Sequence, residues 1–207
     1  MDWDEKALCY AERTLRLIFE YRFVPLFCIG SSISWQEKLL KYAETVMQTS
    51  DEKKFSYQSY FDKCMENGVG TITSMDLDIT LLSDLLRFKF KKFYIAKKFE
   101  YLNLIREIVS GRNETGHLTV DIKSKHDNEW YQMVQRSLNA SIKLMEFVRT
   151  TAPEKVNRRG QIVQYAWDFY NLPKEVMGEF YDLSNKLKTI RETFERENYG
   201  ICHDDSA

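Results

Sequence analysis

The sequence has little of what a turn-rich or disulfide-bonded protein needs. It contains only 8 Gly and 3 Pro in 207 residues, so a sandwich or barrel with many tight turns is disfavoured. Its four cysteines are scattered and form no Cys-x-x-Cys pair, which disfavours a zinc knuckle and suits a reducing compartment. No apolar run reaches membrane-spanning length, and the chain starts with acidic residues. We therefore expect a cytoplasmic protein without membrane contact.

An excess of one charge is also missing. The 30 basic and 31 acidic side chains leave a net charge of -1, so bulk electrostatics do not drive the chain onto nucleic acid or a membrane surface. Any binding of that kind must come from a local patch.

What is present is the material for a helical core. The chain is 43% hydrophobic and 14% aromatic, and apolar residues recur at steps of three and four. Ser34 and Glu37 have the spacing of a capping box, which predicts the start of a helix. We expect an all-α fold. Helices are expected over about 4–22, 128–149, 162–170 and 173–198. Further helices are expected to start at about 35 and 77, and others to end at about 67 and 111.

The clearest internal boundary is Thr150-Thr151-Ala152-Pro153. It divides the expected domains into residues 1–150, a helical bundle, and 151–207, a helical extension with a short flexible tail. Apolar residues of the last helix are spaced almost as a heptad seam. That seam needs a partner, either this core or another protomer.

The chemistry-bearing residues gather in Arg112-Asn113-Glu114-Thr115-Gly116-His117. Arginine offers a permanently charged fork for phosphate, histidine exchanges a proton near neutral pH, and a carboxamide can orient either. The alternative is a helix cap with an ion pair. On residue types alone that alternative is favoured.

The geometry of the motif depends on where its helix ends. On a straight helix Arg112 and His117 lie about 140° apart, whereas Asn113 and His117 share a face. The apolar periodicity, which includes Phe99, continues up to Ser110-Gly111, so we expect the motif at a helix end or kink. Two flanking glycines relax the backbone there.

A basic stretch precedes the motif. Six of the twelve residues from Arg87 to Lys98 are basic and none is acidic, with aromatic residues between them. This pattern suits a strand of RNA, and the nucleic-acid-binding candidates are Lys91, Lys92, Lys97 and Lys98. A solvated helix face with the Phe residues in the core is an equal alternative.

Several familiar sites are absent from the sequence. It has no Gly-rich phosphate loop, no His-x-x-x-His, no acidic triplet and no serine elbow. We expect neither a metal nor a cofactor. Any phosphodiester chemistry would then depend on Arg112, Asn113 and His117.

The segment Leu104 to His117 resembles the signature of the HEPN superfamily, in which Arg, a polar residue and His follow an apolar helix. Tyr10 to Ile18 with Trp35, and Leu77 to Leu85, are similar to the branch found in a transcript-surveillance endonuclease. The resemblance implies a helical bundle that commonly dimerises, with Arg112 and His117 as the catalytic pair and Asn113 as the polar residue. Gly111 and Gly116 depart from that pattern, since many members have helix formers there.

Two functions follow from the resemblance. One is a metal-independent endoribonuclease that leaves a 2',3'-cyclic phosphate, acting as a toxin or phage-defence effector. The other is a catalytically silent module that binds RNA or a protein. The expected partners are RNA and a second copy of the chain, with an antitoxin or a nucleotidyltransferase as further alternatives.

Overall fold

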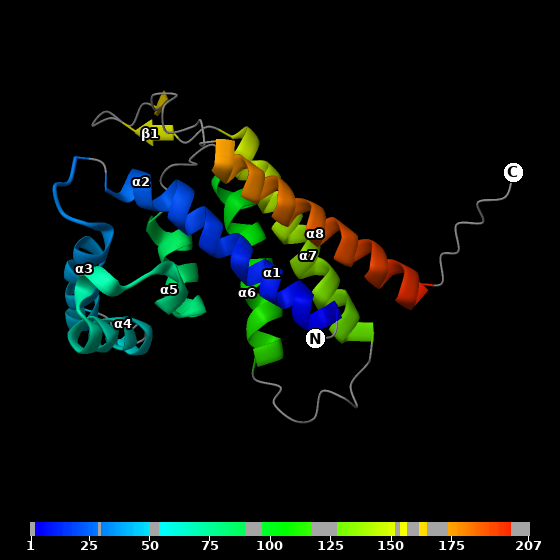
Figure 1. Ribbon diagram of the computed structural model, residues 1–207, viewed down its shortest axis with the longest axis horizontal. Coiled ribbons are helices and arrows are strands. Elements are labelled where there is room, and N and C mark those ends of the chain that lie inside the picture. The colour runs from blue at the N-terminus through cyan, green and yellow to red at the C-terminus, as the bar shows by residue number, and fades with distance from the viewer. Residues whose placement is uncertain are drawn as a thin grey trace, which may run out of the picture. The chain divides into compact units, whose positions relative to one another are not determined.

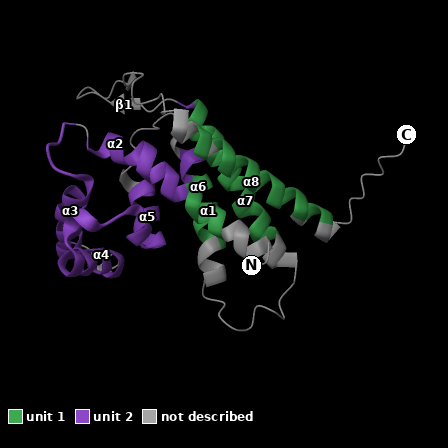
Figure 2. Ribbon diagram, viewed as in Figure 1, with its two compact units in different colours: residues 1–14, 103–150, 173–207 green, residues 15–102, 151–172 purple. Residues whose placement is uncertain are grey.

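The computed structural model describes residues 3–28, 30–49, 54–89, 97–116, 128–151, 154–156, 162–164 and 174–199. These residues form an all-α protein with one small hairpin, as Figure 1 shows, so the expected fold class is confirmed. The chain divides into two compact units, coloured in Figure 2. Unit 1 comprises residues 1–14, 103–150 and 173–207, and unit 2 comprises 15–102 and 151–172.

Unit 1 is built on two antiparallel helices, α7 (Asn128–Thr150) and α8 (Lys174–Tyr199), which pack along their length (Figure 1). The start of α1 (Trp3–Ile18) and most of α6 (Lys98–Gly116) complete this unit. Three apolar residues of α8 are buried, namely Leu183, Leu187 and Ile190. The seam expected on the last helix therefore has a partner within its own unit.

Unit 2 begins with the end of α1, the π-helical turn η1 (Phe19–Phe23) and α2 (Val24–Phe27). An antiparallel pair follows, α3 (Trp35–Thr49) and α4 (Lys54–Asn67). Two short 3-10 turns, η2 (Val69–Thr71) and η3 (Ser74–Asp76), lead into α5 (Ile79–Asp84) and the π-helical turn η4 (Leu85–Lys89). The hairpin of β1 (Glu154–Val156) and β2 (Ile162–Gln164) also belongs to this unit.

Local sequence signals set several helix ends. The capping box is confirmed, because Ser34 N–H donates to Glu37 Oε2 and Glu37 N–H donates to Ser34 Oγ, both at 3.2 Å. Gly68 follows α4 with φ of +84°, which glycine adopts without strain. Asp78 caps α5 by accepting from Thr80 N–H at 2.7 Å.

Two expectations for the elements were wrong. Residues 162–164 form strand β2, paired with β1 from Glu154↔Gln164 to Val156↔Ile162, rather than the start of a helix; the β-branched pair Ile162 and Val163 favours a strand. The helical region expected over about 4–22 extends to Phe27, and Pro25 does not end it. The backbone continues through the π-helical turn, and Pro25 stands in the first turn of α2, where its missing N–H costs no hydrogen bond.

The expected division at residue 150 coincides with a break between units, since α7 ends there. The compact units nevertheless group the chain differently from 1–150 and 151–207, because α8 packs with α7. The two expected domains stay a prediction. None of the described helices is both long enough and apolar enough to cross a membrane.

Candidate functional site

Five of the six residues of the motif, Arg112 to Gly116, form the end of helix α6, in agreement with the expected helix end. Helix α6 continues without interruption through Gly111 and ends at Gly116, so Ser110-Gly111 is neither its end nor an interruption. The backbones of Arg112 and Asn113 are therefore helical, and neighbouring residues of a helix point about 100° apart. His117, the residue after the end of α6, lies outside the described residues.

The helical phase of α6 gives Arg112 and Asn113 different positions. Ile105, Ile108 and Gly111 are buried and define the core-facing stripe of this part of α6. Arg112 follows Ile108 by four positions and continues that stripe, at about 40° from it. Asn113 is about 140° from Ile108 and continues the opposite face. The side chains of both residues lie outside the described part of the structure.

Gly111 is required by a close approach of α6 to α7. A Cβ atom at position 111 would stand 2.8 Å from Ser137 Cβ and 3.1 Å from Ser137 Oγ, well inside van der Waals contact. Ser137 is buried, and its Oγ has no hydrogen-bond partner among the described residues. The turn of α6 that precedes Arg112 is thus held against α7, and position 111 has no room for a side chain.

The predicted lysines are only partly described. Lys97 is exposed in the turn before α6. Lys98 is the first residue of α6, and its side chain lies outside the described residues, as do Lys91 and Lys92 entirely. The structure therefore does not test whether the candidate residues come together.

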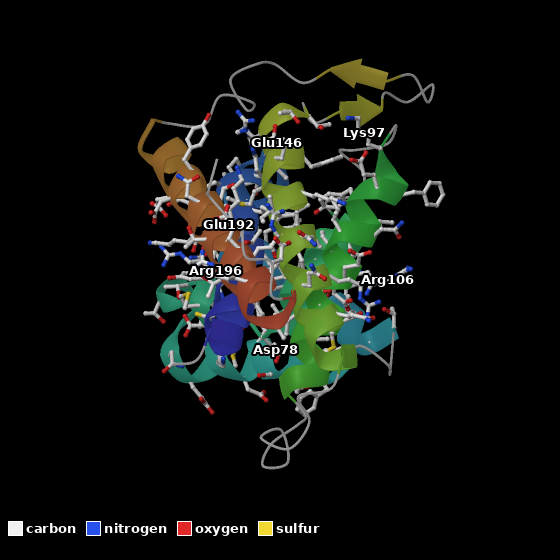
Figure 3. The ribbon with its side chains drawn as sticks, turned by 90° about the vertical axis from the view of Figure 1, so that its right-hand side faces the viewer. Asp78, Lys97, Arg106, Glu146, Glu192 and Arg196 are labelled. Carbon is white, nitrogen blue, oxygen red and sulfur yellow. The ribbon has the colours of Figure 1, made fainter. Side chains whose placement is uncertain are left out.

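The basic residues of unit 1 fall into two kinds. Several have carboxylate partners one helical turn away on α7 or α8, for example Arg149 with Glu146 at 2.6 Å and Lys186 with Asp182 at 2.6 Å. Arg106 on α6 is exposed and has no acidic residue three or four positions from it; Figure 3 shows its side chain directed away from the helix. Among the described residues, Arg106 thus has no ion pair of the kind that Arg149 and Lys186 form within their helices.

Unit 2 contains a pair of buried tyrosines that were not among the predicted site residues. Tyr57 and Tyr60 are buried, and burial raises the pKa of both phenols far above the ordinary value. Tyr60 Oη donates to the carbonyl of Gln36 at 3.0 Å. Phenols with such pKa values stay protonated near neutral pH and serve as hydrogen-bonding core residues. No group of three or more metal-ligating side chains occurs in the part of the chain that the structure describes.

One exposed side chain and one buried contact at α6 were not predicted from the sequence. Phe99 was expected on the apolar side of its helix, but its side chain is 79% exposed, so that expectation was wrong. Tyr101 takes the buried position instead, and its hydroxyl donates to the carbonyl of Leu86 at 3.1 Å. The signal that could have found this is the phase of Tyr101 with Leu104 and Ile108, from which Phe99 lies on the far side.

Comparison with known proteins adds no family assignment. No protein family, no curated protein and no solved structure matches this chain.

Proposed function

We propose that this protein is a metal-independent endoribonuclease of the HEPN type. The observation that carries the proposal is the position of Arg112, which continues the core-facing stripe of α6 directly after the tightly packed Gly111. The guanidinium of an arginine carries a permanent charge and binds anions through several donors. A phosphate group would be a suitable partner for it.

The proposed chemistry needs only the residues of the motif. His117 removes the proton of a ribose 2'-hydroxyl, whose oxygen then attacks the adjacent phosphorus. The 5'-oxygen of the next nucleotide leaves and takes up a proton, so the products are a 2',3'-cyclic phosphate and a 5'-hydroxyl. Arg112 stabilises the charge that develops on the phosphoryl oxygens, and Asn113 orients the imidazole or a phosphate oxygen.

A second copy of the chain would complete this chemistry. One histidine serves poorly as both the base for the 2'-hydroxyl and the acid for the leaving oxygen. In a two-fold dimer with two motifs across one cleft, each His117 would perform one of these steps. The apolar seam of α8 packs against α7 within unit 1. The proposed dimer would therefore form through another surface.

A second candidate is an RNA-binding module without cleavage activity. It is favoured by the exposed Lys97 and Phe99, which lie outside the motif. This candidate predicts RNA binding that is independent of His117.

The test is RNA cleavage by the purified full-length protein in EDTA. We expect His117→Ala and Arg112→Ala each to lower the cleavage rate by about 100-fold or more, the scale of a lost general base or charge stabiliser. His126→Ala and Arg106→Ala are matched controls, since they remove the same side chains outside the motif. Equal cleavage by all four variants would reject these roles, and RNA binding without cleavage by the wild type would favour the silent module.

A further inference from the structure

A buried contact joins a residue before the basic segment 87–98 to a residue after it. Leu86 directly precedes the segment and Tyr101 lies just after it, and the Tyr101 hydroxyl donates to the Leu86 carbonyl at 3.1 Å. Both residues are fully buried. The two residues that flank the basic segment are thus joined in the core of unit 2.

The same contact fixes the direction of Phe99. Tyr101 is two positions further along α6, so the two side chains point about 160° apart on the helix. Because Tyr101 is buried, Phe99 is turned outward and is 79% exposed. An aromatic ring in water forgoes the favourable burial that such a large apolar surface normally provides. Its exposure follows from the helix geometry, and most of the Phe99 side chain faces solvent.

The charges around this ring favour a polyanion. Lys97, labelled in Figure 3, is exposed two positions before Phe99. The twelve residues that end at Lys98 carry six basic side chains and no acid. The first acidic residue after this segment is Glu100, which lies about 100° around the helix from Phe99. A flat apolar ring close in sequence to an exposed lysine complements the two parts of a nucleotide, its base and its phosphate.

We propose that Phe99 and Lys97 form a binding site for single-stranded RNA, in which Phe99 stacks on an unpaired base and Lys97 contacts the adjacent phosphate. A single strand is required because the bases of a duplex are already stacked on each other, whereas an unpaired base offers a free face. The site deepens the proposed function by naming the form of RNA that the protein holds. It rests on that function only in taking RNA as the substrate.

The experiment measures binding rather than cleavage. Full-length protein is titrated into a fluorescent single-stranded oligoadenylate whose 2'-hydroxyls are methylated, so that attack by a 2'-oxygen is blocked. The dissociation constant is recorded over a series of salt concentrations for the wild type, Phe99→Ala, Phe99→Trp and Lys97→Ala. Phe55→Ala is the matched control, because Phe55 is 85% exposed in the same unit and lies outside the basic segment.

The variants should differ in RNA affinity and in the salt dependence of that affinity. Phe99→Ala should weaken binding about tenfold or more, the usual loss when a stacking ring is removed, without changing the salt dependence. Phe99→Trp should bind at least as tightly as the wild type. Lys97→Ala should lower the slope of log affinity against log salt by about 0.7, the value for one phosphate contact on a single strand. Phe55→Ala should match the wild type.

Two results would overturn the site. One is an affinity of Phe99→Ala equal to that of Phe55→Ala. The other is unchanged RNA affinity together with loss of self-association in sedimentation, which would make a second copy of the chain the occupant of this surface. Because the oligonucleotide cannot be cleaved, these results are independent of catalysis, whose failure would appear only in the EDTA assay.

Discussion

The two compact units differ in the contacts that stabilise each of them internally. In unit 1 the apolar seam of α8, with Leu187 fully buried, packs on α7, and the ion pairs lie at the surface. In unit 2 a buried arginine, Arg16, donates to the carbonyls of Ser74 and Leu77, and at Leu77 the distance is 3.2 Å. Both units have an apolar core, and unit 2 adds buried polar contacts between distant parts of the chain.

This difference decides which perturbations each unit tolerates. A surface ion pair such as Arg149 with Glu146 contributes at most about 1 kcal/mol. A buried, charged donor to main-chain carbonyls contributes more, because its removal leaves those carbonyls unsatisfied in the core. Amide hydrogen exchange can follow the stability of each unit separately.

The largest effect is expected for Leu187→Ala in unit 1. Truncating this fully buried side chain should lower the free energy of unfolding by about 2 to 5 kcal/mol. Amide exchange should accelerate in α7 and α8 and stay unchanged in residues 68–78. Lys188→Ala, which removes the exposed neighbour, is the control and should have little effect. Equal acceleration in both units would show that they are a single cooperative body.

Arg16→Met in unit 2 should give the opposite pattern of amide exchange to Leu187→Ala. It keeps the length of the side chain but removes the hydrogen bonds to Ser74 and Leu77, at a cost of about 2 to 3 kcal/mol. Exchange should accelerate in residues 73–82 before it does in α8. Arg13→Met is the control, since Arg13 is exposed on the same helix. An effect of Arg16→Met no larger than that of Arg13→Met would contradict the role of the buried contacts.

A smaller effect is expected where α6 and α7 approach each other. Gly111→Ala should destabilise the protein by about 1 to 2 kcal/mol, because overpacking outweighs the better helix propensity of alanine. Adding Ser137→Gly removes the atoms that the new Cβ would meet, so the double variant should be more stable than the sum of the single effects predicts. Additive thermal unfolding data would refute the close contact.

The smallest effect is expected for the pH response of Asp76. Hydrogen bonds from the N–H and Oγ1 of Thr73, both 2.8 Å from Asp76 Oδ2, hold the pKa of this carboxyl below its usual range. Its contribution to stability is therefore complete above the ordinary pKa of about 3.9 and is lost as the pH falls through the lower value of the folded state. The amide shift of Thr73, followed by NMR, should titrate below that pH, and should cease to do so in Asp76→Asn.

The difference between local spacing and distant contacts explains what the sequence could predict. Local signals predicted most helices of both units, the capping box at Ser34 and the apolar seam of α8, because each depends on spacing within one segment. The contact of Arg16 with Ser74 joins residues 58 positions apart, and no local pattern encodes it. The strand at 162–164 was missed because, although Ile162 and Val163 favour a strand, its formation also depends on pairing with 154–156.

For the candidate site, the sequence could identify residue types but not their surroundings. The apolar run before Arg112 correctly indicated a helix, yet the need for Gly111 depends on Ser137 of another helix. Phe99 was assigned to the wrong face because Tyr101 shifts the phase of the buried stripe. The catalytic roles of Arg112, Asn113 and His117 stay predictions.

The central claim is that Arg112 and His117 cleave RNA through its own 2'-hydroxyl. The most direct measurement is mass spectrometry of the new RNA ends after incubation with the wild-type protein in EDTA. We predict 2',3'-cyclic phosphate and 5'-hydroxyl ends that are absent with His117→Ala and present with His126→Ala. Ends bearing a 3'-hydroxyl and a 5'-phosphate, or cyclic ends that persist in His117→Ala, would contradict the claim.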